Sequence, residues 1–227
     1  APWDALLLPA CGLKAGSDTT EWKFVETTAD WKTLTVGFNR GGKRYGVRGA
    51  MGTFEIVFVA GKTTKVNFTF TGVVVPEVDA TQFTPAFSAT NDTAGSRLVS
   101  ATTTLNSAAI CFSQATFTLG NTVEAIPCPN DAGGIDRMWI AGRESRFTMD
   151  PIEELAAPRN DDAIYRAGTL HAFSMAYGNM LMTMPKLQLI QIAPGVRQGA
   201  SARQLTYLPT MNAAAGDEFV LDLDTTD

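Results

Sequence analysis

Residues 51–75 have the sequence MGTFEIVFVAGKTTKVNFTFTGVVV, and this pattern predicts a β-hairpin with two long arms. Apolar and polar side chains alternate along each arm with a period of two, which places them on opposite faces of a strand. Residues 61–64 separate the arms and begin with a glycine, which adopts the positive φ angles that such turns often need. The alternating apolar side chains are Phe54, Ile56 and Phe58 in the first arm and Val66, Phe68 and Phe70 in the second.

The polar side chains of the same hairpin belong to the opposite face. An antiparallel sheet commonly packs one face on the core and leaves the other to water. We therefore expect a continuous solvent-facing surface along the hairpin, and the function of the chain depends on what this surface lines. The residues predicted to form it are Glu55, Lys65, Asn67, Thr69 and Thr71.

A second hairpin precedes the first one. Residues 32–40 alternate in the same way, the pair Gly41-Gly42 predicts a tight turn, and residues 43–50 return. Together with the two arms described above, this predicts four consecutive antiparallel strands between residues 32 and 75.

The remainder of the chain predicts further short strands and two short helices, at residues 2–11 and 161–173. No βαβ rhythm, internal repeat or linker divides the sequence. The prediction is a mainly β, antiparallel sandwich or barrel with one or two short helices, in a single domain that covers residues 1–227.

Residues 76–104 have a different composition, rich in Thr, Ala, Asp, Asn and Ser, and we expect an extended loop or arm with little regular structure. A loop of this length in a compact domain is usually functional or disordered. We expect it to dock on a neighbouring subunit. The residues predicted to take part are Pro76, Asp79, Phe83 and Phe87.

Composition excludes some function classes. The chain has 227 residues, a net charge of −5 and a pI of about 4.9, and it lacks the basic patch with which proteins hold nucleic-acid phosphates. No apolar run is long enough for a membrane-spanning helix. The three cysteines, Cys11, Cys111 and Cys128, have no CxxC spacing, so neither a disulfide framework nor a zinc site is expected.

No pattern of catalytic residues emerges, and we expect neither an enzyme nor a cofactor. The one histidine, His171, falls in the middle of the predicted second helix, where a packed or surface position is favoured over a catalytic one. The run Gly41-Gly42-Lys43 is interpreted as a turn, because it lacks most of the phosphate-loop pattern.

Three other groups of residues have a structural and a functional interpretation. The acidic side chains within residues 218–224 are expected to form a solvated face of a strand or, alternatively, to bind a hard cation. The methionines at residues 175–184 are expected to fill the core or a subunit interface, and Cys111 is expected to be inert core. The acidic residues are Glu218, Asp222 and Asp224, and the methionines are Met175, Met180, Met182 and Met184.

Residues 48–80, RGAMGTFEIVFVAGKTTKVNFTFTGVVVPEVDA, resemble the centre of the tail tube proteins of long-tailed bacteriophages. The resemblance continues in residues 3–12, 143–153 and 216–223, so it covers most of the chain. Members of the family usually have further strands before the first of these segments, and we expect that this chain lacks them. The positions that match the central pattern are Gly49, Gly52, Ala60, Gly61, Lys62, Phe68, Phe70, Thr71, Gly72, Pro76 and Asp79.

The resemblance implies a structural protein of the virion tail, assembled in the host cytoplasm. Proteins of this family form hexameric rings whose hairpins join into one β-barrel around a lumen. The rings stack into a tube around a tape-measure protein, and DNA later passes through the lumen without specific binding. On this interpretation, the polar face of the hairpin lines the lumen.

Two alternatives remain open at this point. A β-sandwich binding module, of the carbohydrate-binding or adhesin type, would present aligned aromatic side chains, but Trp31 and Trp139 are scattered along the sequence and no platform is evident. An enzyme would need a polar constellation that the sequence does not contain.

Overall fold

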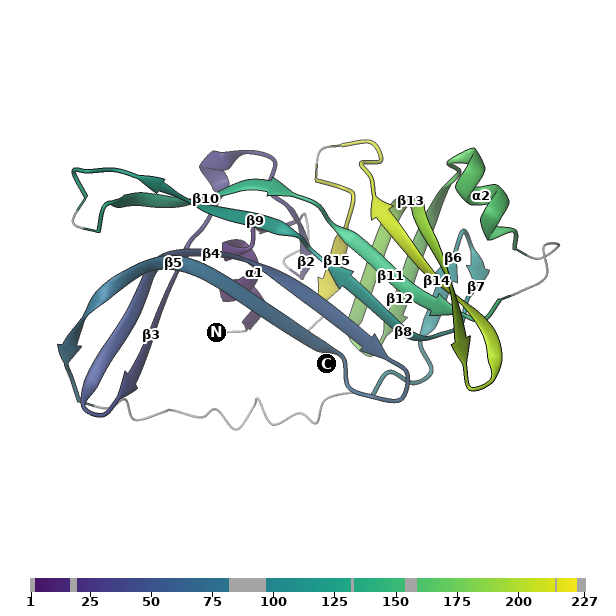
Figure 1. Cartoon of the computed structure of the whole chain (residues 1–227), viewed down its shortest axis with the longest axis horizontal. Coiled ribbons are helices and arrows are strands. Elements are labelled where there is room, and N and C mark those ends of the chain that lie inside the picture. The colour runs from purple at the N-terminus through teal and green to yellow at the C-terminus, as the bar shows by residue number, and fades with distance from the viewer. Residues whose placement is uncertain are drawn as a thin grey trace.

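The computed structural model describes residues 3–16, 20–81, 97–131, 133–153, 159–214 and 216–223. The fold is mainly β and antiparallel with two α-helices, which confirms the predicted fold class. The molecule is elongated, with a curled body at one end and a long flat wing at the other (Figure 1). We use the name wing for residues 34–52, 71–79 and 121–143.

The element bounds are as follows. The helices are α1 (Trp3–Ala10) and α2 (Asp161–Ala167), with a 3-10 turn η1 (Thr28–Asp30). The strands are β1 (Leu13–Ala15), β2 (Glu21–Phe24), β3 (Leu34–Arg40), β4 (Lys43–Val59), β5 (Lys65–Asp79), β6 (Thr102–Leu105), β7 (Ala108–Ala109), β8 (Phe112–Thr118), β9 (Asn121–Pro127), β10 (Ile135–Arg143), β11 (Arg146–Pro151), β12 (Leu170–Tyr177), β13 (Met180–Arg197), β14 (Ala200–Pro209) and β15 (Val220–Leu223).

Within the described residues, thirteen strands form one sheet and β9 and β10 form a second, two-stranded sheet. The main path of the large sheet is β1-β2-β15-β13-β14-β11-β8-β4-β3, and β12, β6 and β7 continue from β13. β4 is the strand that connects the two ends of the molecule: its first half lies in the wing between β3 and β5, and its second half lies between β5 and β8 of the body.

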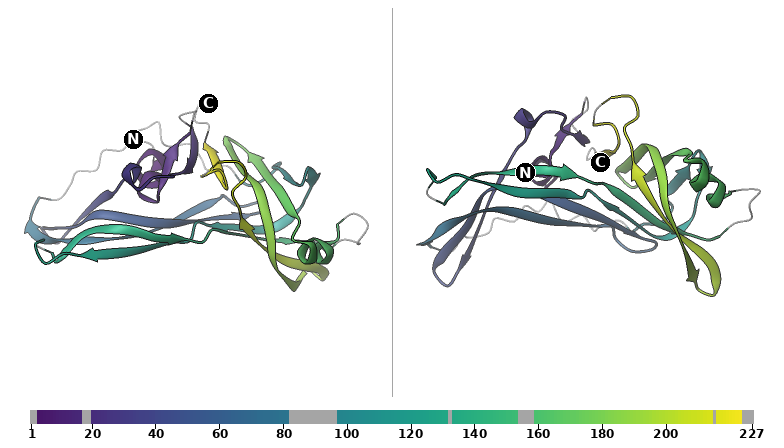
Figure 2. Two further views of the ribbon diagram at one scale, coloured as in Figure 1. Left: turned by 90° about the horizontal axis from the view of Figure 1, so that it is seen from above. Right: turned by 45° about the horizontal axis from the view of Figure 1, so that its top comes forward.

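The sheet of the body curls back on itself, and the core lies inside the curl. Phe219, just before β15, stacks on Phe117 of β8 with ring centroids 4.2 Å apart, although three strands separate β15 from β8 in the sheet. Figure 2 shows this curl from two further directions. Met175, Met182 and Met184 are fully buried in this core, as predicted.

The prediction of four strands between residues 32 and 75 is wrong, because the structure has three. Residues 43–50 and the first arm of the hairpin form one continuous 17-residue strand, β4. A shift in register occurs between Arg48 and Met51, and Gly49 has a φ angle of 60° there. The glycine accommodates a bulge inside the strand, so the chain bends without ending it.

The predicted loop at residues 76–104 is also shorter than expected. β5 continues through Pro76 to Asp79, and β6 occupies Thr102–Leu105. Proline is tolerated in this strand because it pairs on one side only, with β4, among the described residues. Phe83 and Phe87 of the predicted arm lie outside the described residues.

The second helix ends earlier than predicted. Asn160 caps α2 by accepting a hydrogen bond from the Ala163 amide. The helix stops at Ala167 because Gly168 takes the left-handed conformation, with a φ angle of 62°. His171 therefore lies on β12 and not in a helix.

Candidate assembly surface

The hairpin of β4 and β5 is held in a single register. Phe54 lies directly opposite Phe68, and a tight turn with Gly61 at a φ angle of 74° joins the arms. Gly52 is required inside this hairpin, since a Cβ atom there would lie 2.4 Å from the Thr69 carbonyl oxygen. The predicted hairpin and its turn are confirmed.

The two faces of the hairpin differ as the alternation predicts. The core-facing side chains of the first arm, Phe54, Ile56 and Phe58, are at most 1% exposed. Those of β5 are half-buried, and the Trp3 ring of α1 packs on Phe68 with centroids 5.9 Å apart. The apolar face of the hairpin therefore forms one wall of the core.

The five residues predicted to face a lumen come together on the other face. Glu55 lies directly opposite Asn67, and the remaining three follow on β5 at intervals of two residues. Glu55 is half-buried and the four on β5 are exposed: Lys65, Asn67, Thr69 and Thr71. The structure thus confirms one polar surface along the hairpin, whereas what it faces stays a prediction.

The sheet of β9 and β10 covers the part of this face that lies in the wing. Met51, Val73 and Met138 of β10 form a small second core between the two layers. Arg48 also binds Asp131, in the turn between β9 and β10, with 2.8 Å between guanidinium nitrogen and carboxylate oxygen. These contacts fix the wing as two packed layers (Figure 1).

The outer edge of β5 is open within the part of the chain that the structure describes. Within the described residues, β5 pairs with β4 and with no other strand over all of its 15 residues. No charged side chain lies between Lys65 and Glu77. A long, uncharged edge strand is a template for pairing with another chain unless it is covered.

Exposed apolar side chains accompany this open edge. Val36, Val47 and Val74 lie side by side across β3, β4 and β5, and Val74 is 75% exposed. Next to them, Phe38 is 54% exposed and stacks on Tyr45 with centroids 5.2 Å apart. This apolar row continues the core-facing side of the hairpin onto the wing, beyond the point where α1 covers it.

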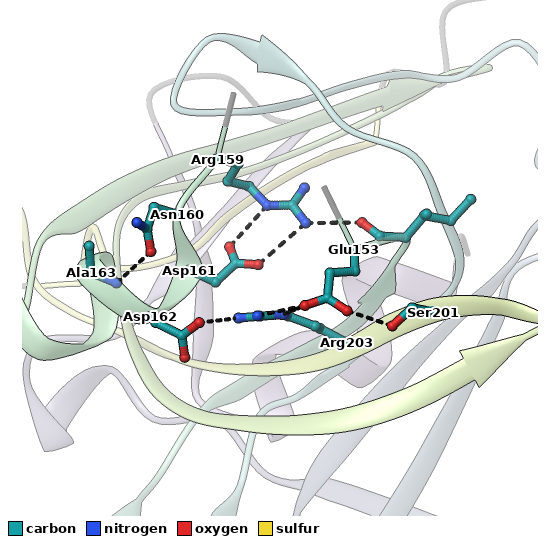
Figure 3. Close-up of polar contacts among 9 residues, drawn as sticks. Glu153, Arg159, Asn160, Asp161, Asp162, Ala163, Ser201 and Arg203 are labelled. Carbon is teal, nitrogen blue, oxygen red and sulfur yellow. Dashed lines mark hydrogen bonds and ion pairs between the residues drawn. The ribbon is translucent and has the colours of Figure 1, made fainter. Parts of the chain in front are cut away.

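Ionic contacts tie α2 and the end of β11 to β14 at the other end of the molecule (Figure 3). The Arg203 guanidinium binds Glu153 at 2.6 Å and Asp162 at 2.8 Å. Hydrogen bonds from Ser201 and Arg203 lower the pKa of Glu153, and the carboxylates of Asp162 and Glu153 raise the pKa of Arg203.

A second ionic contact lies beside this cluster. Arg159 binds Asp161 at 2.9 Å and donates a hydrogen bond to the Ile152 carbonyl oxygen. The arrangement positions α2 against β14.

The other residues singled out from the sequence are dispersed. Gly41 and Gly42 both have positive φ angles and form the turn between β3 and β4, as predicted. Glu218 forms an ion pair with Arg143, and Asp222 lies on β15, whereas Asp224 is outside the described residues. In the described part of the chain, no group of three or more His, Cys, Asp or Glu residues is placed to hold a metal ion.

Two predictions about single side chains are wrong. Cys111 is exposed and not part of the core, because Ile110 takes the inward position just before β8 begins. Trp31 and Trp139 are not scattered: their rings touch, with centroids 4.7 Å apart. The rings are inclined at 61° to each other, so they do not form the flat platform that stacks on sugars.

Comparison with known proteins does not assign the chain to a family. No protein-family model matches the sequence, and no curated protein matches it. Among the described helices, none has the length and apolar character needed to traverse a membrane.

Proposed function

We propose that this chain is a structural subunit that assembles into closed rings, and that the rings stack into the tail tube of a long-tailed bacteriophage. The open edge of β5 carries the proposal, because none of the described residues pairs with this 15-residue strand on the side away from β4. A protein avoids aggregation when a specific partner occupies such an edge. The resemblance of residues 48–80 to the tail tube proteins supports a tail tube as the form of this assembly.

The wing supports ring closure, since it has two different open edges. β3 and β5 flank β4, and each pairs only with β4 there among the described residues. Contact between different edges of successive copies is head-to-tail, and such contacts generate rings when the rotation closes. Closure into a barrel removes the edges altogether. The hexameric symmetry follows from the family resemblance.

The polar face of the hairpin supports a lumen that conducts DNA. Its five residues include one cation, Lys65, and one anion, Glu55, and the remainder are neutral. The whole chain has a net charge of −5. A lining without a basic patch does not hold phosphates, so DNA slides through it. The partners in this proposal are further copies of the chain, the tape-measure protein inside the assembled tube and the DNA in transit.

Negative-stain electron microscopy of the purified chain at high concentration tests the proposal. Stacked rings or tubes with a central channel support it. The mass of the polypeptide is measured in the same sample, so that proteolysis is not mistaken for a failure to assemble. An intact chain that stays monomeric at all concentrations contradicts it.

A further inference from the structure

The body contains a cavity of about 390 Å³ that the assembly surface does not use. It lies between the β6–β7 hairpin and α2, at the end of the molecule opposite the wing (Figure 1). Its volume falls in the range of small-molecule sites, and such sites combine mostly apolar walls with a few polar groups. The apolar wall includes Leu105, Ile110 and Ile164, and the polar groups include Asn106, Asn160 and His171.

His171 is the unusual member of this wall. The side chain is 7% exposed, and its Nδ1 atom is fully enclosed without a hydrogen-bond partner among the described residues. Buried polar atoms are nearly always hydrogen-bonded, and an unpaired one costs about 1–3 kcal/mol. Burial lowers the pKa of His171. The charge of Arg159 lowers this pKa further, whereas the charge of Asp161 raises it. The imidazole is therefore neutral near pH 7, with one donor and one acceptor nitrogen.

The walls of the cavity are held in place before any ligand arrives. Asn106 and Ser107 both have positive φ angles in the turn between β6 and β7, and the Asn106 amide donates to the Ala172 carbonyl oxygen at 2.7 Å. On the opposite side, the pairs Arg159–Asp161 and Arg203–Asp162 fix α2 (Figure 3). Binding to a preformed cavity avoids the cost of ordering its walls.

We propose that this cavity binds a small uncharged molecule with an apolar body and one hydrogen-bonding group, which pairs with the imidazole of His171. An apolar body replaces water along the walls, and the hydrogen-bonding group pairs with the imidazole of His171, whose Nδ1 atom has no partner among the described residues. A charged ligand is disfavoured, because the arginine and the aspartates beside the cavity already pair with each other. This inference does not depend on ring or tube assembly.

Nuclear magnetic resonance of the imidazole nitrogens tests the proposal directly. His171 is the one histidine of the chain, so its nitrogen signals need no assignment. Phenol serves as the probe, and toluene serves as the control with the same ring and no hydroxyl group. We expect phenol to shift the His171 nitrogen signals and to bind roughly three to ten times more tightly than toluene, the worth of one neutral hydrogen bond. Unchanged signals in millimolar phenol, or equal affinity for the two probes, overturn the proposal.

Two variants distinguish binding of the probes in this cavity from binding elsewhere on the protein. His171→Leu is expected to bind phenol and toluene equally, since it keeps the cavity and removes the acceptor. Ala109→Trp, in the exposed part of the wall, is expected to weaken both probes without unfolding the chain. If His171→Leu does not fold, the comparison of phenol with toluene in the wild type tests the hydrogen bond to His171, and Ala109→Trp tests the cavity. A preference for phenol that survives in His171→Leu, or unaltered binding in Ala109→Trp, contradicts the proposal.

Discussion

Phe54 of β4 and Phe68 of β5 lie directly opposite each other, with ring centroids 5.8 Å apart. Residues that lie opposite in an antiparallel pair share one face of the sheet. The same register therefore places Glu55 opposite Asn67 on the other face. One pairing thus determines both the wall of the core and the polar surface of the hairpin.

The two faces of the hairpin are expected to respond differently to substitution. Thr69→Lys and Thr71→Lys change exposed residues, and we expect the free energy of unfolding to stay within about 0.5 kcal/mol of the wild type. Phe54→Ala removes a ring that is 1% exposed, and we expect a loss of about 3–5 kcal/mol. Urea unfolding of the monomer measures both, and equal effects on the two faces contradict the face assignment.

The same lysine variants also test the proposed lumen. We expect Thr69→Lys and Thr71→Lys to form rings as the wild type does, because both side chains lie on the polar face, opposite the apolar row that contains Val74, and the main chain of β5 is unchanged. The added charges then lie in the channel and slow the passage of DNA, which ejection assays on reconstituted tails measure. Rings with wild-type DNA passage argue against a lumen position for these residues.

The open edge is tested by two neighbouring valines of β5. Val74 is 75% exposed, whereas Val73 is 7% exposed and packs against Met51 and Met138. We expect Val74→Lys to leave the monomer stable and to reduce assembly, since a charge in the exposed apolar row beside the edge opposes contact of this row with another copy of the chain. Sedimentation velocity over a range of concentrations follows the assembly.

Val73→Lys is the matched comparison for that variant. It places an unpaired charge in the contact between the wing layers, so we expect loss of folding and not merely loss of assembly. Val74→Lys chains that assemble with wild-type affinity would remove this edge from the proposed interface.

Local patterns made the hairpin predictable. A period of two and a glycine turn are properties of consecutive residues, and they identify the two arms of the hairpin and both of its faces without knowledge of the remainder of the fold. The end of α2 was not predictable in the same way. Leu170 and Phe173 fit the i, i+3 spacing of a helix, whereas β12 buries the alternate residues His171, Phe173 and Met175. The difference depends on Gly168, whose left-handed conformation ends the helix before them.

Contacts between distant residues were beyond the reach of the sequence. Trp31 and Trp139 are 108 positions apart, and they meet because β10 packs over β4 and β5. The cavity beside His171 similarly requires β6, β7, α2 and β12 to come together. A single histidine in an apolar run gives no signal for such an arrangement.

His171 is expected to dominate the pH dependence of stability between pH 7 and pH 5. Its folded-state pKa lies below the ordinary value of 6.5, so protonation favours the unfolded chain. The contribution of the neutral imidazole is complete above pH 6.5 and is lost as the pH falls towards the folded-state pKa. Glu153 and Asp217 have lowered pKa values, and their contributions are lost only below their ordinary values of 4.5 and 3.8.

Thermal unfolding at a series of pH values measures this effect. We expect the melting temperature of the wild type to fall between pH 7 and pH 5, and that of His171→Phe to change less over the same interval. Identical slopes for the two proteins mean that another group is responsible.

The three cysteines are expected to react in the order of their exposure. Cys111 is exposed, Cys128 is half-buried and Cys11 is buried. Burial raises the pKa of Cys11 from 9.0 to about 12. At pH 8 the thiolate fraction of Cys11 is therefore roughly a thousandfold smaller than that of an ordinary thiol, and the thiolate is the reactive form. Mass spectrometry after iodoacetamide treatment is expected to find Cys111 modified first, and Cys11 modified only when urea unfolds the chain. Early modification of Cys11 in the native protein would show that α1 opens, because this cysteine directly follows that helix.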